Sequence, residues 1–212
     1  KTLYENGIKF MDSGDKLKAI ELFTKSIELM KNWMNLDQRG VAYMHIGKFK
    51  KAEKDLIESI QLDKNAINIC NLGALTDKKG EHIAAIELFN KSIELESENP
   101  NAFYNRGISN YQLENYEESI NDYSKAIELD NSKSSAYYNR AFTRQKLGDF
   151  DLAIKDYDKA EELGSTNEGL YINRGYCKCK INEIDEGLVD LKKADELDCE
   201  EAKGLIEQFE NK

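Results

Sequence analysis

The chain has 212 residues, of which one third are charged, with a formal net charge of −10 and one proline. This composition favours long, solvent-exposed helices over sheets joined by tight turns. The acidic balance argues against nucleic acid and anionic lipid as partners, because binding either of them needs a positive surface. No apolar run approaches the roughly 20 residues that span a bilayer, so no membrane contact is expected.

A repeat of 33 or 34 residues runs through the sequence. It is marked by the small residues Gly7, Gly40, Gly73, Gly107, Ala141 and Gly175, each followed after twelve positions by Ala19, Ala52, Ala85, Ser119, Ala153 or Gly187. Seven positions after each first small residue stands Gly14, Gly47, Gly80, Glu114, Gly148 or Asn182. Glycine and asparagine tolerate the left-handed conformation that ends a helix. The pattern therefore predicts that each unit folds as a helix A, a tight turn and a helix B.

This layout, including the stretches at residues 136–140 and 147–154, resembles the tetratricopeptide repeat, a helix–turn–helix of 34 residues. The resemblance implies an all-α, right-handed α-α superhelical solenoid of six such units. An apolar stripe of Ala202, Leu205, Ile206 and Phe209 predicts a C-terminal capping helix. We expect a single domain over residues 1–212, with repeats at about 1–32, 33–65, 66–99, 100–133, 134–167 and 168–199 and the cap at about 200–212.

Four predicted helices A carry an arginine just before the small residue, and an aspartate follows each arginine by sixteen positions. The pairs are Arg39 with Asp55, Arg106 with Asp122, Arg140 with Asp156, and Arg174 with Asp190. In the other two repeats both positions change together, to Asn6 with Leu22 and to Leu72 with Leu88. Buried charges need partners, and guanidinium fits carboxylate geometrically. We therefore expect ion pairs within repeats rather than arginines that read phosphate or RNA.

The resemblance also implies that the A helices line a concave groove. Two positions before the small residue, four successive repeats carry asparagine, whose amide can both donate to and accept from a peptide backbone. This row is similar to the asparagine ladder of the O-linked N-acetylglucosamine transferase. Large side chains of types enriched at interfaces flank it. The predicted peptide-binding residues are Asn71, Asn105, Asn139, Asn173, Tyr104, Tyr138, Ile108, Tyr111, Phe142, Tyr176, Lys146 and Lys180.

A second role for these asparagines stays open, namely a hydrogen bond to the backbone of a neighbouring repeat. The face is expected to be acidic toward the N-terminus, through Glu5, Asp12, Asp37 and Asp77, and basic toward the C-terminus, through Lys146 and Lys180. Such polarity could orient a ligand. The family's carboxylate clamp for chaperone tails is not expected, because its positions carry Met34, Ile67, Asn101 and Ser135.

The sequence thus predicts a protein–protein interaction module or scaffold that binds an extended peptide segment of a protein partner. The alternatives are a regulatory or targeting fragment of a larger enzyme, and a structural protein that self-associates through its first repeat. The two histidines, His45 and His82, lie in separate repeats, so catalysis is not expected, and neither is a cofactor or a metal. The cysteines Cys70, Cys177, Cys179 and Cys199 are expected to be structural thiols in a reduced, cytoplasmic protein. Because the chain starts at Lys1, an upstream targeting segment is left open.

Overall fold

The computed structural model describes residues 2–210, so the sequence predictions at residues 1, 211 and 212 lie outside the described residues. Every regular element between residues 2 and 210 is an α-helix, which confirms the all-α prediction. The chain groups into two compact units, residues 1–109 and 110–212, and each is described by itself. The expectation of one continuous domain stays a prediction.

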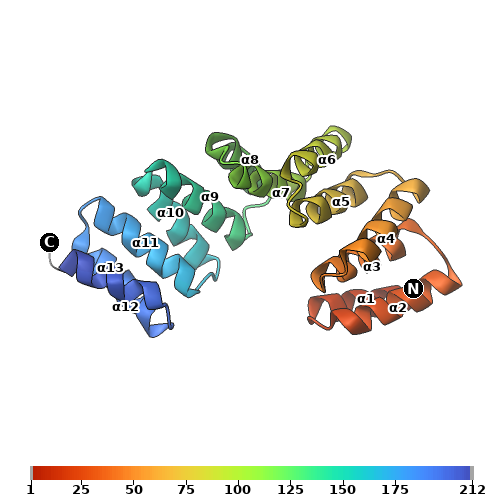
Figure 1. Ribbon diagram of the computed structural model, residues 1–212, viewed down its shortest axis with the longest axis horizontal. Coiled ribbons are helices and arrows are strands. Elements are labelled where there is room, and N and C mark those ends of the chain that lie inside the picture. Colours follow the sequence, from red (N-terminus) through yellow and green to blue (C-terminus); the bar gives the residue numbers. More distant parts are fainter. Residues whose placement is uncertain (1, 211–212) are drawn as a thin grey trace. The chain divides into compact units, whose positions relative to one another are not determined.

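The helices alternate between A and B members of successive hairpins (Figure 1). The A helices are α1 (Thr2–Asp12), α3 (Trp33–His45), α5 (Ala66–Lys78), α7 (Pro100–Gln112), α9 (Ser134–Leu147) and α11 (Glu168–Lys180). The B helices are α2 (Lys16–Leu29), α4 (Phe49–Leu62), α6 (His82–Leu95), α8 (Tyr116–Leu129), α10 (Phe150–Glu162) and α12 (Ile184–Glu196), and α13 (Glu200–Glu210) follows. The first unit holds α1 to α6, the second holds α8 to α13, and α7 crosses the boundary.

The turns between helices A and B adopt the predicted left-handed conformation in all six hairpins. The φ angles are +91° at Gly14, +71° at Gly47, +84° at Gly80, +62° at Glu114, +85° at Gly148 and +70° at Asn182. Glycine adopts this region without a Cβ clash, and asparagine tolerates it better than most residues. Glycine and asparagine therefore mark these turns in the sequence because they tolerate a positive φ angle.

Small residues on helix A let the large side chain of helix B lie directly against its backbone. A Cβ atom added to Gly40 would lie 2.8 Å from Cγ of Leu56, and one added to Gly73 would lie 2.7 Å from Cε1 of Phe89. Both distances are too short for a real contact, so the predicted close approach of the two helices is confirmed at these positions. Leu56 and Phe89 are fully buried as a result.

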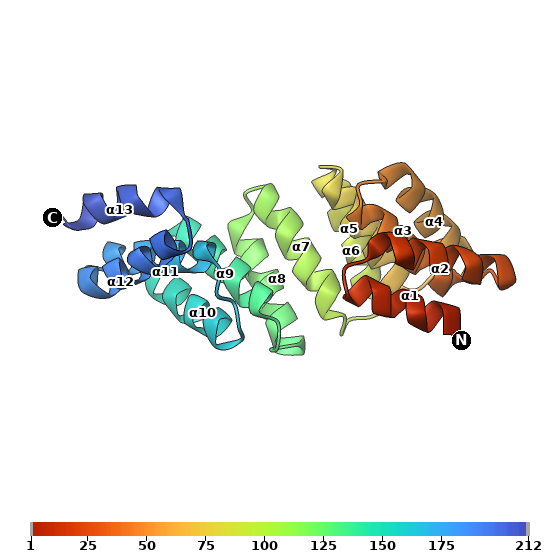
Figure 2. The same cartoon turned by 90° about the horizontal axis from the view of Figure 1, so that it is seen from below.

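Helix α13 covers the end of the second unit, as the apolar stripe predicted. Ala202 and Phe209 are buried, and Leu205 and Ile206 pack on the same core cluster as Leu191 of α12. Figure 2 shows α13 alongside α11 and α12. Without this helix, the apolar surface of α11 and α12 would face water.

Three of the four predicted arginine–aspartate pairs lie within one unit, and all three are bidentate. Arg39 donates to Asp55 at 2.7 and 2.9 Å, Arg140 to Asp156 at 2.8 and 2.7 Å, and Arg174 to Asp190 at 2.8 and 2.7 Å. Arg106 and Asp122 belong to different units, and their pairing stays a prediction. The arginines are thus confirmed as structural in these three repeats.

A further partner of these arginines was not predicted from the sequence. Nη1 of each bonds a residue of the preceding helix B, over 2.6 to 3.2 Å: Thr24 for Arg39, Asn90 for Arg106, Ser124 for Arg140 and Asp158 for Arg174. The sequence did carry a signal for this contact. Where the next repeat has Leu72 in place of arginine, the corresponding helix B residue is the apolar Ile57.

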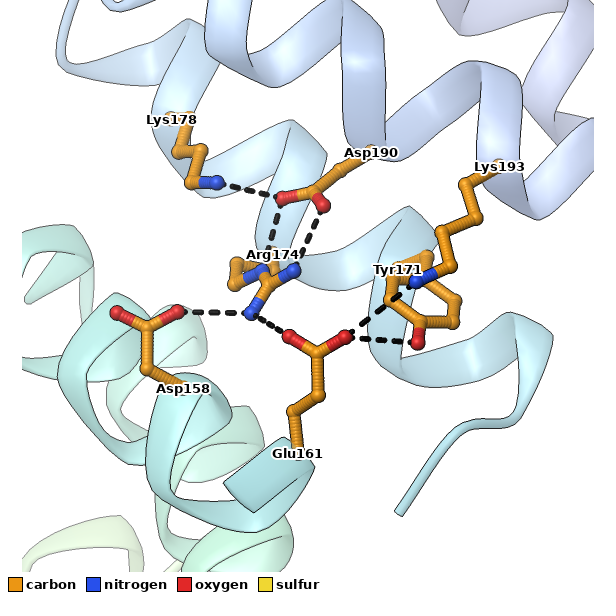
Figure 3. A network of polar contacts seen from close by, with 7 residues as sticks. All are labelled: Asp158, Glu161, Tyr171, Arg174, Lys178, Asp190 and Lys193. Atoms are coloured by element: carbon orange, nitrogen blue, oxygen red, sulfur yellow. Dashed lines mark hydrogen bonds and ion pairs between the residues drawn. The ribbon is translucent and has the colours of Figure 1, made fainter. Parts of the chain in front are cut away.

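The largest of these networks surrounds Arg174 on α11 (Figure 3). Its guanidinium also bonds Glu161 at 2.6 Å, and Glu161 in turn accepts from the hydroxyl of Tyr171 at 2.8 Å. Burial opposes the charge, yet the hydrogen bonds to Asp190 and Glu161 raise the pKa of Arg174 above its ordinary value. Arg174 therefore stays charged while it joins α11 to α10 and α12.

We predict that Arg39→Ala lowers the free energy of unfolding by about 3 kcal/mol, because the buried Asp55 loses its cation. The triple variant Arg39→Leu, Asp55→Leu, Thr24→Ile copies the apolar set of the third repeat and should recover most of that loss. Urea unfolding followed by circular dichroism measures both variants. A triple variant no more stable than Arg39→Ala would contradict this account.

Candidate functional site

Three asparagines of the predicted row, Asn71, Asn105 and Asn173, form hydrogen bonds between consecutive A helices. In the first unit, Nδ2 of Asn71 donates to both carboxylate oxygens of Asp37, at 2.9 and 3.1 Å, and Nδ2 of Asn105 donates to Sγ of Cys70 at 3.8 Å. In the second unit, Nδ2 of Asn173 donates to the hydroxyl of Tyr138 at 3.2 Å. Each acceptor lies 34 or 35 positions earlier, so one asparagine joins its repeat to the preceding one.

These bonds bear on the two roles that the sequence left open. The asparagine amides do bond a neighbouring repeat, but their acceptors there are side chains rather than the backbone. Asn173 also donates to the carbonyl of Gly169 in its own helix, at 2.7 Å. A contact between this row and a ligand stays a prediction. The acceptors Asp37, Cys70 and Tyr138 share one position, three before the small residue, and that pattern was readable in the sequence.

Asp37 on α3 is a buried carboxylate that hydrogen-bonds to amides rather than to a cation. It is fully buried and is held by Asn71 and by Nε2 of Gln38 at 3.3 Å. Burial raises the pKa of Asp37 from its ordinary value of 3.8 to about 6, although both amide hydrogen bonds oppose the shift. The predicted acidic N-terminal part of the face therefore includes one carboxylate that no ligand reaches without a rearrangement.

Aromatic rings gather on the A helices of the second unit. Tyr138 stacks on Phe142 with their centroids 6.5 Å apart, and Tyr111 lies 5.6 Å from Phe142. Tyr176 contacts Phe209 of the cap at 6.4 Å, edge to face. Rings held in this way present a large contact area at little cost in conformational entropy.

The two predicted lysines lie over these rings. Nζ of Lys146 is 5.1 Å from the centroid of Phe142, and Nζ of Lys180 is 5.1 Å from the centroid of Tyr176. Each lysine stands four residues after its ring, which places both on one face of the helix. The cation–π contacts engage both charges with the protein itself.

A groove of about 910 Å³ opens among α9, α11 and the start of α13, all in the second unit. Five predicted residues line it: Tyr138, Phe142, Lys146, Asn173 and Tyr176. The structure adds nine that were not predicted: Gln145, Glu168, Gly169, Ile172, Asp198, Cys199, Glu200, Glu201 and Leu205. We call this the second-unit groove. At the C-terminal part of the face, where lysines were predicted, this groove also carries the carboxylates of Glu168 on α11 and of Asp198, Glu200 and Glu201 at and before the start of α13.

The remaining predicted residues do not line this groove. Asn71, Asn105, Tyr104 and Ile108 belong to the first unit, while Tyr111, Asn139 and Lys180 lie in the second unit outside the lining. A separate hollow of about 470 Å³ in the first unit is mainly apolar and is lined by Tyr4, Leu29, Met30 and Met34 among others. It holds none of the predicted binding residues.

The described residues show no arrangement that points to catalysis. Nδ1 of His82 lies 2.8 Å from Oδ1 of Asp77, and the hydroxyl of Ser109 donates to the same oxygen at 2.6 Å. The serine therefore bonds the carboxylate and not the imidazole that would have to activate it. Among residues 2–210, no group of three or more histidine, cysteine, aspartate or glutamate side chains could hold a metal ion. None of the helices in this range is long and apolar enough to cross a membrane.

Comparison with known families decides what this repeat is. Models of the tetratricopeptide repeat match residues 36–65, 68–99 and 134–167, and a further model described as a TPR repeat matches residues 109–148. The chain belongs to the tetratricopeptide repeat family. This family's fold is typically a non-catalytic interaction module, and its members bind protein partners. This tetratricopeptide repeat chain is accordingly a protein–protein interaction scaffold.

Solved structures share the fold. The chain is similar to MamA, at 25% identity and a TM-score of 0.67, over 77% of this chain and 96% of that one. It is similar to pilF of Pseudomonas aeruginosa at 15% identity, with a TM-score of 0.84 over 99% and 96%. It is also similar to a chain of the APC/C hetero-tetramer Cut9–Hcn1 at 16% identity, with a TM-score of 0.86 over 98% and 42%. No curated protein matches the chain.

We predict that Asp37→Asn stabilises the tetratricopeptide repeat chain at pH 8 by about 2–3 kcal/mol, and that the gain falls to about 1 kcal/mol near pH 4.5. The folded state holds the Asp37 proton more tightly than the unfolded state, so stability contributed by this group rises as pH falls through about 6. Burial, with a smaller contribution from Asp37, raises the pKa of nearby Tyr4 and of Cys70, although the hydrogen bond from Asn105 opposes the shift at Cys70, and both groups stay neutral in this range.

The measurement is the difference in unfolding free energy between the parent chain and Asp37→Asn across pH 4.5 to 8. The subtraction removes groups that titrate alike in both proteins. A constant difference over that range would show that Asp37 has an ordinary pKa in the folded state.

Proposed function

We propose that this scaffold binds an extended segment of a partner protein, and that the second-unit groove is a principal contact surface. The observation that supports this is the gathering of Tyr138, Phe142, Asn173 and Tyr176 around one hollow of about 910 Å³. That volume lies within the range of roughly 300–1,000 Å³ that ligand sites occupy. Its lining joins aromatic and aliphatic side chains to several charged and amide side chains, so a ligand there can make both apolar and polar contacts.

The chemistry of the groove suits a peptide in extended form. Adjacent helices pack about 8–10 Å apart and an extended chain advances about 3.3–3.6 Å per residue, so each helix A would meet roughly every third ligand residue. Nδ2 of Asn173 is held by Tyr138 and Gly169, which fixes the plane of the amide. A fixed amide binds at lower entropic cost, and its oxygen, which accepts from Nε2 of Gln145 at 3.4 Å, has a second lone pair for a backbone N–H of the ligand.

The test starts from dodecapeptides selected by phage display on the intact chain. The affinity of a selected peptide is then measured by fluorescence anisotropy. We predict that Asn173→Ala weakens binding about tenfold. The matched control is Asn121→Ala, which removes an exposed asparagine from helix B α8. Both variants are first checked for equal melting temperatures. If the two variants bound the peptide with equal affinity, Asn173 would not contribute to the site. Failure to select any peptide would count against the proposal as a whole.

A specific observation favours self-association as a second function. Leu29 is 80% exposed and Met30 is 68% exposed, and both border the first-unit hollow. Adjacent exposed apolar side chains commonly mark surfaces that bind another protein. A second copy of the chain could cover them.

We predict that the mass measured by light scattering rises with protein concentration and that Leu29→Lys abolishes this rise, because a charge on the covered surface is costly to desolvate. Leu152→Lys is the control, since Leu152 is an exposed leucine of helix B in the second unit. A mass that stays monomeric at all concentrations would exclude this second function.

A further inference from the structure

The second-unit groove has a strongly uneven charge. Four carboxylates line it, those of Glu168, Asp198, Glu200 and Glu201, against the single lysine Lys146. The ammonium of Lys146 is held over the ring of Phe142 at 5.1 Å. The groove therefore joins an aromatic surface to a negative rim.

These four carboxylates are not neutralised by the protein. None of them forms an ion pair with a lysine or arginine of residues 2–210. The contrast with the interior of the same unit is clear, because Asp190 bonds both Arg174 and Lys178. The charge of the rim is left for solvent or for a ligand.

Acidic residues stand at the start of several helices, but only some of these helix starts border the groove. Acidic residues are favoured in the first turn of any helix by the helix dipole. First-turn acids are also present in α1, α8, α10 and α12, and they are absent from α3, α5, α7 and α9. Glu168 begins α11, and Glu200 with Glu201 begins α13, the two helices that meet at the groove. Of the first-turn acids in the second unit, Glu168, Glu200 and Glu201 are the ones that line the aromatic hollow.

We propose that the groove selects a partner segment in which lysine or arginine residues flank a large apolar side chain. This rests on the proposed function and names the class of partner. The apolar side chain would lie against Tyr138, Phe142 and Tyr176, and the flanking cations would meet the four carboxylates of the rim. Charge complementarity of this kind sets partner choice and association rate. The net charge of −10 on the whole chain attracts a cationic segment in the same sense.

The experiment uses an array of random decapeptides probed with the fluorescently labelled intact chain. We expect the bound peptides to be enriched in lysine or arginine next to an aromatic or aliphatic residue. For peptides resynthesised from the array, the variant Glu168→Gln, Asp198→Asn, Glu200→Gln, Glu201→Gln should bind about tenfold more weakly at low salt. The matched control is Asp151→Asn, Glu183→Gln, Asp185→Asn, Glu186→Gln. It removes the same charge from exposed positions outside the groove and should lose much less affinity than the variant of the four groove carboxylates.

The outcomes separate this inference from the function on which it rests. We call the variant that neutralises the four groove carboxylates the rim variant. If the bound peptides lacked basic enrichment, and if Asn173→Ala lost affinity while the rim variant kept it, the inference would be overturned and the proposed function would stand. An equal loss in the rim variant and its control would also overturn it, because net charge alone would explain the effect. If the chain bound no peptide on the array, both would fail. If light scattering showed that the parent chain is an oligomer and the rim variant is a monomer, a second copy would be the occupant of the groove and the inference would be wrong.

Discussion

In the repeats that carry it, the guanidinium of helix A joins each hairpin to the preceding one. In three repeats it donates two hydrogen bonds to the aspartate of its own helix B and a third to a residue of the preceding helix B. One planar group with fixed donor directions therefore sets both the angle within a hairpin and its register on the previous one. Where Leu72 stands in place of arginine, apolar residues also occupy the partner positions, Leu88 in its own helix B and Ile57 in the preceding helix B.

A second layer of hydrogen bonds joins the A helices themselves. The asparagines donate to side chains one repeat earlier, and the acceptor changes from a carboxylate at Asp37 to a thiol at Cys70 and a phenol at Tyr138. The candidate binding surface is therefore also part of the structure. Side chains fixed by such contacts lose little entropy when a ligand arrives, so a framework that holds the repeats together also prepares the face for binding.

The capping helix does more than cover apolar surface. By packing Phe209 against Tyr176, α13 closes one side of the second-unit groove and brings Glu200 and Glu201 to its edge. An aromatic surface with an acidic rim exists only because a helix outside the repeat pattern is placed beside the last repeat. The distinctive chemistry of this tetratricopeptide repeat chain is thus concentrated where the repeat ends.

The sequence by itself determined the helices, the turns and the arginine–aspartate pairs found within single units. Each of these depends on residues at fixed spacing within one repeat, and a helical hairpin converts such spacing directly into contact. Periodicity also pointed to Asn173, Tyr138 and Tyr176 as neighbours on one face. It could not give the direction of the asparagine amides, which depends on the acceptor that the preceding repeat presents. Nor could it show that Glu168 and Glu201 border one groove, because α13 lies outside the period and its position is decided by packing against α11 and α12 alone.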